Sequence, residues 1–180
     1  METRIQLLPL QEVHIIAMKE EMQEAFQHGF QAYQKDDGEE DSNHWQVLPD
    51  EDFYRSLRAE GAEAYEAVDA DGLRVGGAII TIDSSKKQGE LAFLYVKVGV
   101  QSRGIGQAIW KAIEAMHPEV EVWETCTPYF DRRNIHFYIN RCGFHAIEFF
   151  NEHHPDPHMP EQYNQEDGLF VFEKRMKYDK

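Results

Sequence analysis

Gln-Ser-Arg-Gly-Ile-Gly, residues 101–106, lies between an apolar strand pattern at residues 91–96 and a helical pattern at residues 105–116. A strand, a glycine-containing turn and a helix in this order present free backbone N–H groups to a phosphate. Gly104 lets the backbone approach a ligand closely, and Gly106 permits a tight start to the helix. The helix dipole adds partial positive charge at the same point. The segment therefore predicts a cradle for a pyrophosphate.

Two other phosphate-binding loops do not fit these residues. No Gly-Lys-Ser or Gly-Lys-Thr ends the turn, so it is not a P-loop. A dinucleotide-binding fingerprint needs three glycines in the order Gly-x-Gly-x-x-Gly, and only the pair Gly104 and Gly106 is present. The leading Gln101 and Arg103, together with the preceding strand, distinguish the segment from an ordinary surface turn.

Length and composition indicate one domain, residues 1–180, with its own core, because 42% of the residues are hydrophobic. The chain carries 33 acidic and 18 basic residues, a formal net charge of −15. Such a balance repels the nucleic-acid backbone and anionic membranes, which argues against both as partners. It favours a cationic partner or substrate, although solubility alone also accounts for it.

The chain shows no signal for export or membrane insertion. Residues 1–14 lack a long apolar run, and no stretch approaches the roughly 20 apolar residues of a membrane span. Two cysteines, Cys126 and Cys142, do not make a disulfide framework. We therefore expect a reduced, cytoplasmic protein.

Apolar periodicity predicts a mixture of strands and helices, α+β or α/β in class. Asp71-Gly72 between two apolar runs predicts a hairpin, and Gly76-Gly77 in its second strand marks close approach of another group. Residues 35–52 are acidic and irregular, which predicts a loop. Strands are expected at residues 4–10, 64–69, 73–82, 90–96, 120–125, 145–150 and 169–177. Helices are expected at residues 15–26, 53–60, 105–116 and from Asp131 or Asn134 to about Cys142, where Gly143 ends the helix.

Gln-x-x-Gly-x-Gly after a strand that ends Leu94-Tyr95-Val96 resembles motif A of the GNAT superfamily, the acetyl-coenzyme A dependent N-acetyltransferases. The resemblance covers residues 90–144. It implies a three-layer α+β fold with a mixed, mostly antiparallel central sheet, splayed fourth and fifth strands and flanking helices. One departure is that Val98, followed by Gly99, stands where the family usually has proline.

The resemblance also implies acetyl-coenzyme A as co-substrate. Backbone N–H groups of residues 102–107 would hold the pyrophosphate. A bulged strand around residues 95–98 would pair with the pantetheine and direct one N–H at the thioester oxygen. The implied coenzyme-binding residues are Leu94, Tyr95, Val96, Val98, Gln101, Ser102, Arg103, Gly104, Ile105, Gly106, Gln107 and Asn134.

Tyr138 is the candidate acid that protonates the leaving thiolate, since a phenol with a pKa of about 10 can donate to a thiol whose pKa is about 8.5. The segment resembles the family's helix-ending pattern, but Gly143 follows Tyr138 by five residues rather than four. Asp131 stands seven residues before Tyr138, where the family usually has Asn, and Asn134 shares a helix face with Tyr138. The alternative is a core tyrosine with a satisfied hydroxyl.

Glu90, at the start of the central strand, resembles the general base of the histone-acetylating branch. Glu124 on the next strand and His136 are alternatives for the base. The histidine-rich stretch at residues 153–158 matches no closed metal site, so no metal is predicted. Cys126 and Cys142 are predicted to be small core residues rather than nucleophiles.

These features predict an N-acetyltransferase in which a primary amine attacks the thioester directly within a ternary complex. The acidic stretch favours a cationic acceptor: a polyamine, an aminoglycoside, a lysine or a peptide N-terminus. The acceptor should enter over the first two helices and residues 151–167. Two alternatives stay open: a coenzyme A-binding module without catalysis, and an acetyltransferase that acts on a protein lysine or N-terminus. Pairing of two copies into a homodimer is compatible with either.

Overall fold

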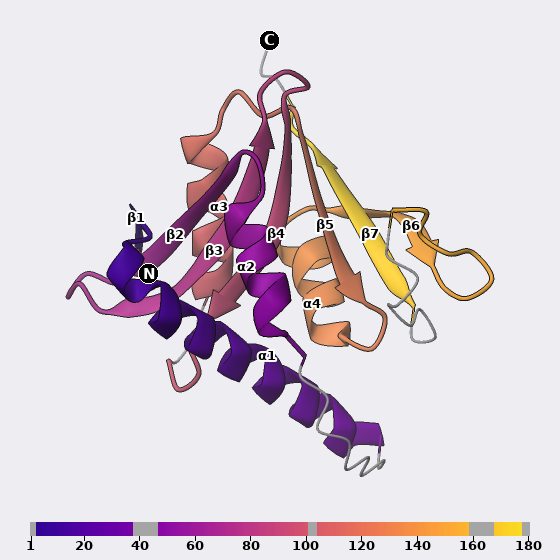
Figure 1. The fold of residues 1–180 in the computed structure, drawn as a ribbon, viewed down its shortest axis with the longest axis horizontal. Coiled ribbons are helices and arrows are strands. Elements are labelled where there is room, and N and C mark those ends of the chain that lie inside the picture. Colours follow the sequence, from indigo (N-terminus) through magenta and orange to yellow (C-terminus); the bar gives the residue numbers. More distant parts are fainter. Residues whose placement is uncertain (1–2, 38–46, 101–103, 159–167, 178–180) are drawn as a thin grey trace.

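Seven strands form one sheet in the order β1-β2-β3-β4-β5-β7-β6 (Figure 1). The computed structural model describes residues 3–37, 47–100, 104–158 and 168–177. All neighbouring strands are antiparallel except β4 and β5, which are parallel. The strands are β1 (Gln6–Pro9), β2 (Ala62–Val68), β3 (Arg74–Asp83), β4 (Gln88–Val96), β5 (Val122–Pro128), β6 (His145–Phe150) and β7 (Leu169–Arg175).

Helices cover both faces of this sheet and make three layers (Figure 1). On one face, α1 and α2 pack against β3 and β4 through buried side chains that include Met18, Met22 and Phe53. On the other face, α3 packs against the sheet through Ile109 and Trp110, and the segment after β5 packs against Phe172 of β7. The helical elements are η1 (Glu12–His14), α1 (Ile15–Asp37), α2 (Asp50–Arg58), α3 (Ile105–Met116), α4 (Arg132–His136) and the π-helical turn η2 (Phe137–Arg141).

The expected hairpin between β2 and β3 is present. Gly72 adopts φ of +79°, a conformation that favours glycine, and the Asp69 carboxylate accepts hydrogen bonds from the amides of Asp71 and Leu73. Gly77 leaves the room that the core requires, because a Cβ there would lie 2.6 Å from the carbonyl oxygen of Tyr65. The fold class expected from the residues, with its mostly antiparallel sheet, is confirmed.

Several element boundaries differ from those expected. Helix α1 continues to Asp37, so it includes the start of the predicted acidic loop. Helix α2 begins at Asp50 rather than Phe53, since three acidic residues in its first turn complement the helix dipole. Strand β5 starts two residues late because the Val120 amide bonds the carbonyl of His117 in a turn. Within the described ranges, no helix is long and apolar enough to cross a membrane.

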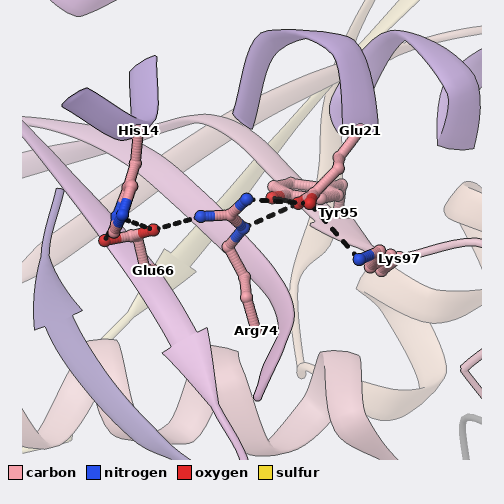
Figure 2. A network of polar contacts seen from close by, with 6 residues as sticks. All are labelled: His14, Glu21, Glu66, Arg74, Tyr95 and Lys97. Carbon is pink, nitrogen blue, oxygen red and sulfur yellow. Dashed lines mark hydrogen bonds and ion pairs between the residues drawn. The ribbon is translucent and has the colours of Figure 1, made fainter. Parts of the chain in front are cut away.

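A chain of polar contacts fixes α1 to the sheet (Figure 2). Arg74 of β3 donates through Nε and Nη2 to Glu21 of α1, both at 2.9 Å, and through Nη1 to Glu66 of β2 at 2.5 Å. The Tyr95 hydroxyl of β4 also donates to Glu21, at 2.8 Å. At the two ends of this network, Lys97 lies 3.4 Å from Glu21 and His14 lies 3.0 Å from Glu66.

Candidate active site

The sheet opens between β4 and β5. The two strands pair only over Gln88–Glu90 and Val122–Glu124. Beyond this point β5 continues to pair with β7, whereas β4 continues to pair with β3. The far halves of β4 and β5 therefore face each other without a backbone ladder, as the resemblance implied for the fourth and fifth strands.

A bulge in β4 lies at this opening. Ile79 pairs with Phe93 and Ile80 with Leu91, so Ala92 has no partner residue on β3. The bulge was expected near residues 95–98, and that position is wrong, because residues 94–96 keep a regular register with β3. An extra residue bends a strand and increases its twist, which helps β4 to turn away from β5.

The C-terminal half of β4 presents backbone groups to the opening. The Lys97 amide donates to the carbonyl of Val75 on β3, at 2.8 Å. Because the backbone groups of successive strand residues point alternately to the two sides, those of Leu94 and Val96 are directed toward the missing neighbour. A ligand with amide groups can pair with them as an added strand. The Tyr95 side chain, by contrast, belongs to the network around Glu21.

Helix α3 is the next element after β4 in the chain, and it begins at Ile105. Gly104 is its N-cap with φ of +83°, and a Cβ there would meet nothing within 4 Å. The first helical bond runs from the Ala108 amide to the Gly104 carbonyl. The amides of Ile105, Gly106 and Gln107 have no acceptor among the residues that the structure describes. These are the donors that a pyrophosphate needs; the predicted ligands Gln101, Ser102 and Arg103 lie outside the described residues.

The start of α3 is joined to the segment that carries Tyr138. A Cβ at Gly106 would lie 3.2 Å from the Phe137 ring, so glycine allows the two segments to pack closely. The side chain of Gln107 donates to the carbonyl of Arg141 at 2.8 Å. Because its side chain is engaged in this way, Gln107 offers its backbone N–H to the cradle.

The extra residue between Tyr138 and Gly143 is absorbed by the π-helical turn η2. The Cys142 amide bonds the carbonyl of Phe137, five residues back, at 3.0 Å. Gly143 ends the segment with φ of +82°, as expected. The Lys174 ammonium donates to the carbonyl of Cys142 at 2.7 Å and holds the end of the turn.

Tyr138 is 6% exposed and packs against Phe144 and Phe172, with ring centroids 5.8 and 5.9 Å away. Burial raises the pKa of its hydroxyl, and a hydrogen bond with Thr125 partly offsets that rise. Thr125 follows Glu124, the last β5 residue that pairs with β4. The candidate acid therefore reaches the point where the sheet opens, from the face covered by α3.

Asn134 is engaged with its own helix start. Its amide donates to Asp131 Oδ1 at 3.0 Å and its side chain to Asp131 Oδ2 at 2.7 Å. Asp131 is therefore the N-cap, one of the two alternatives expected. Burial raises the pKa of the Asp131 carboxyl.

The candidate bases lie at different places. Glu90 and Glu124 are paired residues across β4 and β5, and both side chains are exposed. Neighbouring protein atoms nevertheless exclude part of the water around the Glu90 carboxylate, and this desolvation, with the charge of Glu124, raises its pKa. Since successive strand residues point to opposite faces, Glu124 and Thr125 reach opposite sides of the opening. His136 instead contacts Asn140 on the exposed side of its helix, at 2.8 Å.

Cys126 is unsuited to act as a nucleophile. Cys126 is exposed, so the prediction of a small core residue is wrong for it, whereas Cys142 is buried as predicted. Loss of water around the Cys126 thiol raises its pKa to about 11, with further contributions from the carboxylates of Glu90, Asp156 and Glu124. Near neutral pH the thiol is protonated, and only the thiolate is an effective nucleophile. This arrangement fits direct transfer without a covalent intermediate on the protein.

The histidine-rich stretch forms a surface turn. His154 stacks on Phe150 and contacts Glu148 at 2.6 Å, while the His153 ring lies 3.2 Å from Glu152. Within the described part of the chain, no three His, Cys, Asp or Glu side chains gather so that they could hold a metal ion.

Comparison with known proteins agrees with this geometry. The model of the acetyltransferase (GNAT) family matches residues 17–144. This chain is a member of the GNAT family. The match covers α1 through the end of η2, and so includes β4, the cradle and Tyr138.

Several known proteins are similar to this GNAT chain. It is 44% identical over 138 residues to the uncharacterized protein YrkN of Bacillus subtilis (strain 168), which covers 73% of this chain and 74% of that protein. It also resembles the ribosomal-protein-S18-alanine N-acetyltransferase of Escherichia coli, with 12% identity, a TM-score of 0.64 and coverage of 98% and 97% of the two chains.

Two further solved structures share the GNAT fold. An acetyltransferase of Bacillus subtilis in complex with CoA has 18% identity, a TM-score of 0.61 and coverage of 98% and 100%. The spermidine N-acetyltransferase of Vibrio cholerae, in complex with CoA and spermine, has 12% identity, a TM-score of 0.63 and coverage of 95% and 95%.

Sequence reasoning missed two features of the GNAT site. Thr125 is an ordinary strand residue in the sequence, and only the parting of β4 and β5 shows that its hydroxyl lies at the opening. The ion pair of Arg74 with Glu21 joins residues far apart in the chain, so no local sequence pattern predicts it. The five-residue spacing from Tyr138 to Gly143 was the one available signal for the π-helical turn.

Proposed function

We propose that this protein transfers the acetyl group of acetyl-coenzyme A to a primary amine by direct attack within a ternary complex. The single observation that carries the proposal is the opening between β4 and β5: it exposes β4 backbone without a ladder, and the start of α3 has amides with no acceptor among the described residues. The pantetheine would pair with Leu94 and Val96, and the pyrophosphate would lie on the amides of Ile105 to Gln107. Membership of the GNAT family and CoA in a structure of the same fold support this assignment.

The residues around the opening would divide the chemistry as follows. Glu90, through a water, removes a proton from the acceptor ammonium. The neutral nitrogen attacks the carbonyl carbon of the thioester while a β4 amide donates to the carbonyl oxygen. The C–N bond forms, the nitrogen gives its second proton to water, and the C–S bond breaks. Tyr138 gives its proton to the leaving thiolate and is reprotonated, so that the whole reaction releases one proton to solvent.

A cationic acceptor is the substrate class that the charges favour. Glu90 and Glu124 lie at the opening on the face covered by α1 and α2, and Asp156 also approaches Cys126 there. Carboxylates attract an ammonium group and oppose an anionic acceptor. The Vibrio cholerae enzyme of the same fold acts on spermidine, and the Escherichia coli enzyme acts on an alanine of a ribosomal protein. Both small polyamines and protein amines are therefore candidate acceptors.

The test is thiol release from acetyl-coenzyme A in the presence of single amines: spermidine, an aminoglycoside, free lysine and a peptide with a free N-terminus. Mass spectrometry of each amine identifies the acetylated product, and calorimetry measures coenzyme A binding separately. We expect amine-dependent thiol release with at least one cationic acceptor. Binding without turnover would instead identify a coenzyme A-binding module, and absence of binding would refute the proposed site.

A further inference from the structure

One side-chain hydrogen bond joins β4 and β5 at the vertex of the opening, the point where their backbone ladder ends. The backbone ladder between β4 and β5 ends at the pair Glu90 and Glu124. At the next position, Thr125 Oγ1 donates to the carbonyl oxygen of Leu91 at 2.9 Å, and both residues are buried. The bulge at Ala92 follows immediately. The threonine hydroxyl therefore bridges the strands at the first position where the backbone ladder no longer does.

The same hydroxyl contacts the candidate acid. Thr125 is 3% exposed and pairs across β5 and β7 with Phe172, on which the Tyr138 ring packs with 5.9 Å between ring centroids. Its hydroxyl also approaches that of Tyr138 closely enough to lower the pKa of the phenol against the effect of burial. A hydroxyl has one proton and two acceptor lone pairs. While Tyr138 keeps its proton, Thr125 donates to Leu91 and offers a lone pair to the phenol. Burial raises the pKa of Tyr138, but contact with Thr125 lowers it, the sign expected when the threonine O–H can donate to the phenolate. In both states the Tyr138 hydroxyl is held near the β4 backbone.

We propose that Thr125 is a positioning residue, which sets where β4 and β5 separate and holds the Tyr138 hydroxyl at that point. The proposal rests on the proposed acetyl transfer. When Tyr138 passes its proton to the thiolate, a phenolate oxygen remains beside Thr125. The threonine O–H then turns from Leu91 to donate to this oxygen until the phenolate regains a proton from solvent. No other reactant is needed.

Thr127 provides a matched comparison. It is 2% exposed and points to the same face of β5, two residues beyond Thr125. Loss of its hydroxyl perturbs a buried threonine of the same strand without touching the vertex. A difference between the two positions therefore reports the role of the vertex rather than the general cost of changing a buried threonine.

The experiment compares Thr125→Val, Thr125→Ser, Thr127→Val, Tyr138→Phe and the Thr125→Val/Tyr138→Phe double variant. For each we would measure kcat, KM for acetyl-coenzyme A and for the amine, Kd for coenzyme A and Tm. We expect Thr125→Val to lower kcat about 10-fold, the effect of one lost hydrogen bond, with KM for acetyl-coenzyme A changed less than about 3-fold. Thr125→Ser should recover most of kcat, and Thr127→Val should resemble the wild type.

The double variant separates positioning from general damage. If Thr125 acts through Tyr138, it should be no slower than Tyr138→Phe alone, which we expect to lose about 10²-fold or more in kcat. Multiplicative losses, or equal kcat in the two valine variants, would overturn the proposal. If Thr125→Val does not fold, Thr125→Ala against Thr125→Ser makes the same comparison, because these two side chains differ by the hydroxyl alone.

Hydrogen exchange tests the same bond without catalysis. In peptides that cover residues 88–94, amide exchange should be faster in Thr125→Val than in Thr127→Val, since the strands lose their bridge at the vertex. Equal exchange in both variants would refute the part of the proposal that concerns the sheet. A wild-type protein that turns over no amine would instead refute the proposed function, whatever the exchange shows.

Discussion

At the scale of single residues, the pair Glu90 and Glu124 decides the protonation state of the opening. The two carboxylates belong to directly paired residues of parallel strands. Partial desolvation makes ionisation of Glu90 costly, and the like charge of Glu124 adds to that cost, so the pKa of Glu90 is raised. A raised pKa brings a carboxylate closer to the range in which it can accept a proton from an ammonium.

Replacement of Glu124 by Gln should therefore move the acid limb of the pH profile. A base works when it is deprotonated, so activity falls as pH drops through the pKa of Glu90. Glu124→Gln removes the like charge, which lowers that pKa and shifts the acid limb of kcat/KM to lower pH. The measurement is kcat/KM against pH for the best amine found.

Glu121→Gln is the control for this shift. Glu121 lies near the start of the same strand, and its carboxylate is paired with Lys87 at 2.8 Å. We expect the acid limb of kcat/KM in Glu121→Gln to lie at the same pH as in the wild type. A shift to higher pH in Glu124→Gln, or no shift, would exclude Glu90 as the group that titrates.

At the scale of elements, the turn that begins α3 depends on Gly104. Its φ of +83° is strained for any residue with a Cβ, and the open space around it is where a phosphate would approach. Gly72 has φ of +79° and the same free surroundings, but it belongs to the β2–β3 turn and not to the start of α3.

Gly104→Val and Gly72→Val should thus destabilise the protein to a similar degree, about 1–2 kcal/mol for a left-handed residue with a side chain. Only Gly104→Val should abolish coenzyme A binding, because its branched side chain occupies the place of the phosphate. Calorimetric Kd values and urea unfolding of both variants check this. Retained binding in Gly104→Val would show that the pyrophosphate lies elsewhere.

The π-helical turn makes a prediction of a different kind. In a regular α-helix each residue turns the chain by about 100°, so deletion of one residue misplaces every side chain that follows. In η2 the segment Phe137–Arg141 already holds one residue more than an α-helical turn would. Deletion of Asn140, which is exposed, should convert this turn to α-helix and leave Tyr138 and Phe144 in place.

We therefore expect deletion of Asn140 to preserve folding, coenzyme A affinity and kcat within about 10-fold, whereas deletion of Ala112 in the regular helix α3 should abolish all three. Circular dichroism melts, calorimetry and the thiol assay measure these quantities. Loss of the fold on deletion of Asn140 would mean that the π-helical geometry itself is required.

The elements differ in how far the sequence determines them. Helix α3, the hairpin at Gly72 and the left-handed Gly143 follow from local patterns, because each depends on residues close in the chain. The bulge at Ala92 does not, since a bulge is defined by the register of two strands. The role of Thr125 is equally hidden, because it depends on which strand pair separates. The spacing around Tyr138 showed an irregularity but not that a π-turn absorbs it.

At the scale of the whole molecule, the network around Arg74 joins the layer of α1 to the central sheet beside the opening (Figure 2). Burial opposes ionisation of Glu21, but hydrogen bonds from Arg74 and Tyr95 outweigh it and lower its pKa. Burial likewise opposes ionisation of Glu66, and hydrogen bonds from His14 and Arg74 lower its pKa. The charged network therefore stabilises the position of α1, which covers the face where Glu90 and Glu124 lie.

Arg74→Met should reveal this network through the pH dependence of stability. Near pH 7 the change leaves the buried Glu66 and the partly buried Glu21 without their guanidinium, which costs about 3–5 kcal/mol. In the wild type, carboxylates with lowered pKa values contribute stability that is fully present above the ordinary glutamate pKa of 4.5 and is lost as pH falls through the lowered values. In the variant, burial without the arginine raises both pKa values, so protonation relieves the defect. The difference in free energy of unfolding between wild type and Arg74→Met should therefore shrink on acidification from pH 7 toward pH 4, measured by urea unfolding.

Arg55→Met is the control. It removes a 53% exposed arginine from its pairs with Glu51 and Asp52, and should cost less than about 1 kcal/mol with little change across this range. A deficit in Arg74→Met that stays constant with pH would show that the arginine stabilises α1 by packing rather than by charge.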